Sequence, residues 1–168
     1  DDIYEHITYD GFEFFTIAQI KALKDRTLTM NGVSKSYSMT GWRIGYGAGP
    51  KDIIKAMAKI QSQSTTNPSS ISQAAAVEAL SGTQDFIKTR SESFKERRDF
   101  VVKALNNIKG LNCLKPNGAF YVFPNCKKLL GKKTKLKTDK DFVEKLLEKA
   151  EVAVVQGSAF GLDGYFRI

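Results

Sequence analysis

Residues 31–47 constrain this chain more than any other part of its sequence. They hold one lysine, Lys35, among small and polar residues, and an arginine, Arg43, eight positions later. A lysine that forms an imine needs room around its nitrogen and cationic or apolar surroundings. A guanidinium can grip a phosphate through two parallel hydrogen bonds. Together the two side chains predict a pocket for a phosphorylated aldehyde.

A purely structural interpretation of the same stretch is a strand, a loop and a second strand with a solvated lysine. Residues 27–33 are β-prone and reach a predicted turn at Asn31 and Gly32. Residues 42–48 form a second, glycine-rich strand in which backbones can approach closely. This interpretation explains the hydrophobic pattern but not the combination of Lys35, Arg43 and small residues. We therefore favour the chemical interpretation.

The motif Ser-Lys-x-Tyr-x-Met-Thr-Gly-Trp-Arg-Ile-Gly-Tyr, at residues 34–46, resembles a known cofactor-binding segment. It is similar to that of the class I aminotransferases that depend on pyridoxal phosphate (PLP), and most similar to the bacterial aspartate aminotransferase branch. The resemblance implies that Lys35 is the catalytic residue, which forms a Schiff base with PLP and then moves a proton from the substrate Cα. It implies that Arg43 binds the cofactor phosphate.

The first residues, Asp1-Asp2-Ile3-Tyr4, resemble the family's Asp-x-x-Tyr motif. The resemblance implies that Asp1 faces the pyridine nitrogen of PLP and that Tyr4 hydrogen-bonds the phenolic oxygen of the ring. Asp2 is a rival for the carboxylate role, but the three-residue spacing to Tyr4 favours Asp1. Taken alone, these four residues could belong to any acidic surface segment.

The last residues, Gly-Tyr-Phe-Arg-Ile at 164–168, resemble the family's C-terminal motif. The resemblance implies that Arg167 binds the substrate α-carboxylate. The alternative is an edge-strand arginine exposed to water; the preceding Gly-Ser-Ala-Phe-Gly favours the binding role. Asn67 and Pro68 resemble a segment near the family's dimer interface, although a helix N-cap explains them equally well. Gln156 stands where the family often has proline.

Hydrophobic periodicity predicts helices over residues 51–63, 70–80, about 84–107 and 139–150. Short strands are expected at residues 111–114, 119–123, 152–155 and 164–168. In the helix over 84–107, one side is predicted to be apolar and consists of Phe86, Ile87, Phe94, Phe100, Val101, Ala104 and Leu105. The other side is predicted to be exposed to solvent and carries Arg90, Lys95, Arg97 and Arg98.

This order of elements fits the resemblance, which implies an α/β fold. Residues 1–64 would form the late part of the PLP-binding large domain of a transferase. Residues 65–107 would be linking helices, and residues 108–168 would be the small C-terminal α/β domain. The chain has no starting methionine, and we expect it to begin inside a longer protein. The family's glycine-rich phosphate loop, its ring-stacking aromatic residue and its supporting asparagine all lie upstream of Asp1, so we expect the 168-residue chain alone to be inactive.

The net charge of +8 raises nucleic-acid binding as an alternative function. The excess is concentrated in residues 127–140, which carry seven lysines without interleaved aromatic residues or a recognition-helix pattern. We therefore expect a solvated lysine-rich loop and no nucleic-acid partner.

Other classes of function are disfavoured by what the sequence lacks. No run of about 18 apolar residues and no signal segment occurs, so we expect no membrane partner. Two lone cysteines in a domain of this size are typical of reduced thiols, so we expect a cytoplasmic protein. Cys113 and Cys126 have no metal-ligand spacing, and the single His6 is far away in sequence, so no metal is expected.

The leading hypothesis is a transaminase that moves an amino group between an L-amino acid, aspartate or glutamate, and a 2-oxo acid through PLP on Lys35. Within the superfamily, an aromatic, prephenate, alanine or kynurenine-type transaminase or a non-transaminating PLP lyase also fits. A catalytically dead scaffold is a third class, against which Lys35 is the strongest argument. The resemblance also implies a homodimer.

Overall fold

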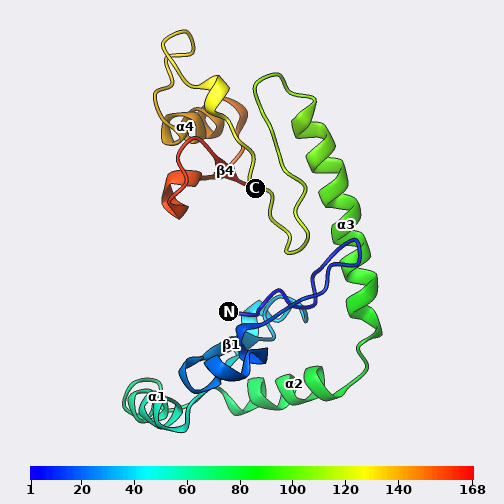
Figure 1. Cartoon of the computed structure of the whole chain (residues 1–168), viewed down its shortest axis with the longest axis vertical. Helices are drawn as coiled ribbons and strands as arrows, with labels where there is room; N and C mark the ends of the chain where they lie inside the picture. The colour runs from blue at the N-terminus through cyan, green and yellow to red at the C-terminus, as the bar shows by residue number, and fades with distance from the viewer. The chain divides into compact units, whose positions relative to one another are not determined.

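The computed structural model describes residues 1–168, which form two compact units, residues 1–92 and residues 93–168. The four α-helices are α1 (Lys51–Ser64), α2 (Ser70–Ser81), α3 (Asp85–Asn106) and α4 (Asp139–Ala150) (Figure 1). The four strands are β1 (Thr29–Gly32), β2 (Gly45–Ala48), β3 (Val155–Gln156) and β4 (Phe166–Arg167). Short 3-10 helices lie at Ile17–Gln19, Lys21–Arg26, Thr40–Trp42, Lys127–Leu129 and Gly157–Phe160.

The first unit is built on an antiparallel pair of strands, β1 and β2. Gly32 is opposite Gly45, and Met30 is opposite Gly47. A Cβ atom on Gly32 would lie 2.9 Å from the Ile44 carbonyl oxygen and 3.2 Å from Ile3 Cδ1. Only glycine therefore lets the backbone of Ile44 and the side chain of Ile3 approach this strand so closely.

The core of this unit joins the strand pair to helix α2. Val33 is fully buried and packs with Ile44 and Ala76, and Tyr37 and Met39 cover the cluster. The alanine at position 76 lets α2 come close because its side chain is small. Helix α1 contributes nothing to the core; its apolar residues Ile53, Met57 and Ile60 are exposed in this chain.

The second unit has its core between helix α4 and the strand pair β3 and β4. Gln156 is opposite Phe166, and Val155 is opposite Arg167. Cys126, Val143 and Phe166 are buried together, with Leu111, Leu129, Phe142 and Val154 packed around them. Helix α4 begins with a capping box, in which Thr138 and Asp141 each satisfy a backbone N–H of the other.

The lysine-rich stretch forms a surface loop of this unit, and all seven of its lysines are exposed. The first of them, Lys127, lies over the Tyr165 ring, with its Nζ 5.3 Å from the ring centre. Gly164 has a φ of +77°, and a Cβ there would overlap the aliphatic part of the Lys127 side chain. The start of the loop is therefore packed tightly, whereas residues 131–135 are exposed.

The four predicted helices are confirmed within one residue at each end. The predicted strands are less accurate. Residues 119–123 form no strand, and residues 111–114 contribute only an isolated bridge from Asn112 to Asn125. The predicted turn at Asn31 and Gly32 is wrong, because both residues lie in β1; the turn follows at residues 34–37.

The predicted faces of helix α3 are partly wrong as well. Arg98 is expected on the solvent-exposed side but is only 5% exposed. Its guanidinium donates a hydrogen bond to the Pro116 carbonyl at 2.9 Å and pairs with Asp99, and these partners satisfy the buried charge. Phe100, expected on the apolar side, is exposed. The boundary between the two units falls inside this helix, whereas the predicted limits 1–64, 65–107 and 108–168 concern domains of a larger protein and stay a prediction.

No helix of the structure combines the length and the apolar character that crossing a membrane requires.

Candidate active site

Lys35 and Arg43 lie in one connection, the segment that joins β1 to β2. The ends of this connection are held together because Gly32 and Gly45 are opposite each other in the strand pair. Buried Val33 and Ile44 are the first and last residues of the connection and anchor it in the core. The structure therefore brings the predicted lysine and the predicted arginine onto a single short loop.

Lys35 is half-buried and lies in the turn at residues 34–37. Its carbonyl accepts a hydrogen bond from the Ser38 N–H at 3.1 Å, which closes the turn. Ser36, the next residue, is 5% exposed, and Ser38 has a φ of +53°. A positive φ at a serine is uncommon and persists where the surroundings hold it. The lysine is thus carried by a turn of fixed shape.

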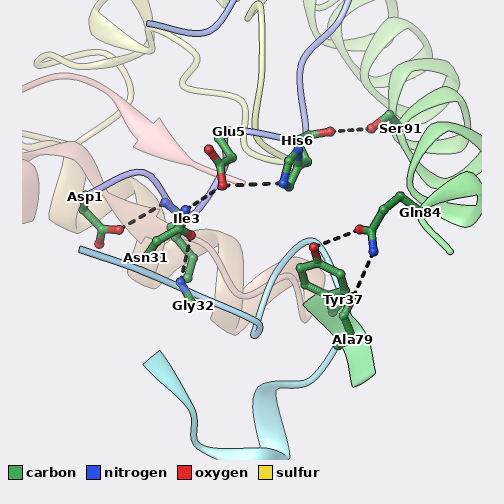
Figure 2. Close-up of polar contacts among 10 residues, drawn as sticks. All are labelled: Asp1, Ile3, Glu5, His6, Asn31, Gly32, Tyr37, Ala79, Gln84 and Ser91. Atoms are coloured by element: carbon green, nitrogen blue, oxygen red, sulfur yellow. Dashed lines mark hydrogen bonds and ion pairs between the residues drawn. The ribbon is translucent and has the colours of Figure 1, made fainter. Parts of the chain in front are cut away.

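Helix α3 and Gln84, the residue before it, supply those surroundings. The Arg90 guanidinium donates hydrogen bonds to the Ser38 hydroxyl at 3.0 Å and to the Ser36 carbonyl at 3.4 Å. The Tyr37 hydroxyl donates to the Gln84 side-chain oxygen at 2.9 Å, and the Gln84 amide donates in turn to the Ala79 carbonyl (Figure 2). The turn is therefore held at three successive residues, 36–38.

Arg43 follows the 3-10 turn Thr40–Trp42 and adopts the left-handed conformation, with φ of +53°. Its side chain is exposed, and one terminal nitrogen donates to the Thr40 carbonyl at 2.7 Å. A guanidinium carries five N–H donors, so this bond orients Arg43 and leaves donors for an anion.

Asp1 and Tyr4 belong to a segment that lies beside β1. The Asp2 N–H donates to the Met30 carbonyl at 2.8 Å, which fixes the segment against the strand. The Asp1 carboxylate accepts a hydrogen bond from the Ile3 N–H at 3.1 Å (Figure 2) and is otherwise exposed. Tyr4 is half-buried. All four residues predicted to meet the cofactor therefore lie in the first unit.

Glu5 connects this segment to β1 and is a residue that no sequence pattern singled out. Its carboxylate accepts a hydrogen bond from the Asn31 amide at 2.6 Å and lies 3.5 Å from His6 Nε2 (Figure 2). The His6 carbonyl accepts a hydrogen bond from the Ser91 hydroxyl at 2.9 Å. The N-terminal segment is thus tied to β1 and to helix α3.

The negative charge of Glu5 affects the pKa of two tyrosines, Tyr37 and Tyr46. Burial, and then the Glu5 charge, raise the pKa of Tyr37. Burial raises the pKa of Tyr46 too, with smaller contributions from Glu5 and Tyr37. Both hydroxyls therefore remain hydrogen-bond donors at neutral and mildly alkaline pH.

Arg167 lies in the second unit, on the short strand β4, and is half-buried. The centre of its guanidinium lies 4.5 Å from the Tyr121 ring centre and 4.3 Å from that of Phe160. Its side chain makes no hydrogen bond and no ion pair within the chain. An anion from outside the chain can therefore use its N–H groups.

Four residues that were not selected from the sequence contact the predicted site residues or the turn that carries them. Arg90 and Gln84 hold the Lys35 turn, and Tyr121 and Phe160 contact Arg167. Their partners are dozens of positions away, except for Phe160, seven residues before Arg167 in the Gly-Ser-Ala-Phe-Gly segment. That aromatic residue between glycines was the one available signal.

The family model for aminotransferase class I and II matches residues 1–168. An aspartate aminotransferase of Rhizobium meliloti (strain 1021) is 63% identical over 100% of this chain and 42% of its own length. A probable aspartate/prephenate aminotransferase of Rickettsia prowazekii (strain Madrid E) is 60% identical over 100% of this chain and 43% of its own length. The chain thus spans less than half the length of these relatives.

Solved structures agree with this likeness. The crystal structure of the Rhizobium meliloti aspartate aminotransferase matches 100% of this chain and 43% of its own, at a TM-score of 0.94 and 63% identity. An aromatic aminotransferase from Pyrococcus horikoshii OT3 matches 99% of this chain and 44% of its own, at a TM-score of 0.89 and 42% identity. These matches confirm the predicted α/β fold of a partial transferase.

Proposed function

Because the chain belongs to the class I and II aminotransferase family, we propose that the full-length protein moves an amino group between an L-amino acid and a 2-oxo acid. The observation that carries the proposal is the placement of Lys35 and Arg43 on one fixed connection, closed by Gly32 and Gly45. One primary amine and one guanidinium thus lie on the same connection, which supports a site for a phosphorylated aldehyde.

The amine, guanidinium, carboxylate and phenol of the proposed site fit pyridoxal phosphate as the cofactor. Lys35 would bond the aldehyde carbon through Nζ, and Arg43 would bind the phosphate with the N–H groups that Thr40 leaves open. Asp1 would hold the pyridine nitrogen protonated, and Tyr4 would donate a hydrogen bond to the ring oxygen. When bound, the cofactor supplies an electron-withdrawing ring that makes the substrate Cα proton acidic.

Residues of the chain itself would transfer the proton and bind the substrate carboxylate. The Lys35 amine, once the substrate amino group has displaced it, would take the proton from the substrate Cα and return it on the cofactor side. Arg167 would hold the substrate α-carboxylate through paired N–H···O bonds, which orients the Cα–H bond for that transfer.

We propose aspartate or glutamate as the amino donor, with oxaloacetate or 2-oxoglutarate as the matching 2-oxo acids. The names of the relatives support this choice, since one is an aspartate aminotransferase and another a probable aspartate/prephenate aminotransferase. Prephenate is therefore the alternative acceptor, and a panel of amino donors and 2-oxo acids distinguishes the two.

We also propose a cytoplasmic homodimer. The exposed apolar residues of helix α1, Ile53, Met57 and Ile60, support a covering surface outside this chain, either in the rest of the full-length protein or in a second copy. The isolated 168-residue chain is expected to be inactive, because it spans less than half of its relatives' length. Transamination by the isolated chain would contradict that expectation.

The deciding experiment is an absorption spectrum of the full-length protein with pyridoxal phosphate, before and after borohydride reduction. The wild type should show a visible band that borohydride abolishes, with the cofactor mass fixed on the peptide that contains Lys35. Lys35→Ala should lack the band and lose transamination. Lys59→Ala, an exposed lysine of α1, is the matched control and should keep both. An unchanged band in Lys35→Ala would overturn the assignment.

A further inference from the structure

We propose that Tyr121 and Phe160 form an aromatic clamp that positions the Arg167 guanidinium for a substrate carboxylate. We further propose that Asp139 fixes the turn that carries Phe160. Tyr121, Phe160 and Asp139 are thus positioning residues that act through Arg167. The inference rests on the proposed function, because the carboxylate that Arg167 binds is that of the amino-acid substrate.

Two aromatic rings contact the Arg167 guanidinium. Ring-centre distances of 4.5 Å to Tyr121 and 4.3 Å to Phe160 are within the range in which a cation is attracted to an aromatic face. Arginine stacks on such faces because its guanidinium is planar and weakly hydrated. The rings therefore shield the guanidinium from water without using its N–H donors.

Backbone hydrogen bonds hold Tyr121 in register with β4, the strand that bears Arg167. Val122 and Ile168, the residues that follow Tyr121 and Arg167, exchange two backbone hydrogen bonds of 3.1 Å each. Such a reciprocal pair fixes two backbone segments against each other. This backbone pairing fixes the position of Tyr121 along β4. It therefore keeps the Tyr121 ring beside the Arg167 guanidinium.

Phe160 is held by its own 3-10 turn, Gly157–Phe160. The Asp139 carboxylate, which is 3% exposed, accepts a hydrogen bond from the Ser158 N–H at 2.6 Å. The Gly157 N–H donates to the Tyr165 carbonyl at 2.7 Å. A charged acceptor on a backbone N–H makes a short and strong bond, so helix α4 fixes the turn that presents the Phe160 ring.

The clamp has a consequence for recognition. With its centre against two rings, the guanidinium keeps its N–H groups for a ligand from outside the chain. That geometry suits a carboxylate, which is planar and accepts two parallel hydrogen bonds. Exclusion of water by the rings strengthens the charge pairing. The clamp should therefore strengthen carboxylate binding and leave the proton transfer at Lys35 unaffected.

The test uses the full-length protein and succinate, a dicarboxylate without an amino group, with affinity measured by calorimetry. Tyr121→Leu and Phe160→Leu should each weaken succinate binding about fivefold, and the double variant about 25-fold. The KM for the amino donor should rise in parallel while kcat changes less than about twofold. Phe160→Tyr, which keeps the ring, should bind succinate like the wild type, and Asp139→Asn should weaken binding in the same direction as Phe160→Leu.

Phe100→Leu is the matched control, because Phe100 is an exposed aromatic residue of helix α3 and does not belong to the clamp. It should leave succinate affinity unchanged. If a leucine variant fails to fold, Tyr121→Met and Phe160→Met remove the ring at similar volume and carry the same expectation. Unchanged succinate affinity in the folded double variant would overturn the clamp.

The same measurements separate this inference from the proposed function. A wild type that transaminates, with ring variants that bind succinate normally, contradicts the clamp alone. A wild type that lacks transamination but binds succinate in a ring-dependent manner contradicts the proposed reaction and supports the clamp as a carboxylate-binding device.

Discussion

The Arg90 guanidinium donates a hydrogen bond to the Ser38 hydroxyl at 3.0 Å, and so fastens the turn that carries Lys35 to helix α3. Fifty-two positions separate the two residues in sequence. Ser38 has a positive φ, and this contact is one of the forces that hold its unusual backbone conformation. The position of the proposed catalytic amine therefore depends on a residue outside its own motif.

Replacement of Arg90 should slow catalysis more than it weakens binding. In the full-length protein, we expect Arg90→Ala to lower kcat about tenfold with a small change in KM, because a loosened turn misplaces the lysine amine. Arg90→Lys should restore part of the rate. Lys88→Ala, at an exposed position of the same helix, is the control. Steady-state kinetics check this, and an unchanged kcat in Arg90→Ala would contradict the role.

A methyl group at Gly32 should destabilise the protein. The added Cβ would lie 2.9 Å from the Ile44 carbonyl oxygen and press on Ile3, so Gly32→Ala should lower the free energy of unfolding by about 1–3 kcal/mol. Gly41→Ala is the control, because a Cβ there meets nothing within 4 Å. Urea unfolding of the full-length variants measures both, and equal stability would contradict the packing described for β1.

Neighbouring arginines of helix α3 should differ in their effect on stability. Arg98→Ala removes a buried side chain and leaves the half-buried Pro116 carbonyl without its donor, and we expect a loss of about 2 kcal/mol. Arg97 is exposed and lies 5.7 Å from the Phe94 ring centre, so Arg97→Ala should cost less than about 1 kcal/mol. Thermal unfolding compares the two, and a larger loss for Arg97→Ala would contradict the assignment.

Alkaline pH should weaken the fold through Cys126. Burial, and then the Asp139 charge, raise the pKa of its thiol to about 11, whereas the pKa of an unfolded cysteine is about 8.5. Between these values the unfolded state loses a proton that the folded state retains, so the thiol's contribution to stability is full below about 8.5 and is lost as pH rises toward about 11.

Unfolding free energies of the wild type and of Cys126→Ala, measured from about pH 7 to about pH 11, test this. The decline with pH should be shallower in Cys126→Ala. A thiol reagent should react with Cys126 only after unfolding, because the side chain is fully buried. An equal pH dependence in the two proteins would contradict the raised pKa.

The helices could be predicted from the sequence because their signals are local. Helix α4 shows why: its apolar residues recur every three or four positions, and Thr138 and Asp141 provide a capping box at its start. The strand pairs depend on distant partners. Asn31 and Gly32 have the composition of a turn, but their pairing with Tyr46 and Gly45 places them in β1.

The residues of the candidate site also differ in whether local sequence identifies them. Lys35 and Arg43 could be selected because their spacing and small neighbours carry a chemical meaning within one short segment. Glu5, Arg90 and Tyr121 could not, because each acts on a residue far away in sequence, at a distance that only the folded chain defines. The groups proposed to react were thus identifiable from sequence, whereas the groups that hold them became visible in the structure.

The contact between Lys127 and Gly164 has an evolutionary consequence. Any amino-acid substitution at Gly164 adds a side chain where Lys127 already lies, and it does so at a φ that other residues rarely adopt. Residues 131–135, further along the same loop, are exposed and carry no such restriction. In an alignment of orthologues, we expect substitutions and length changes to accumulate at residues 131–135, and position 164 to remain glycine.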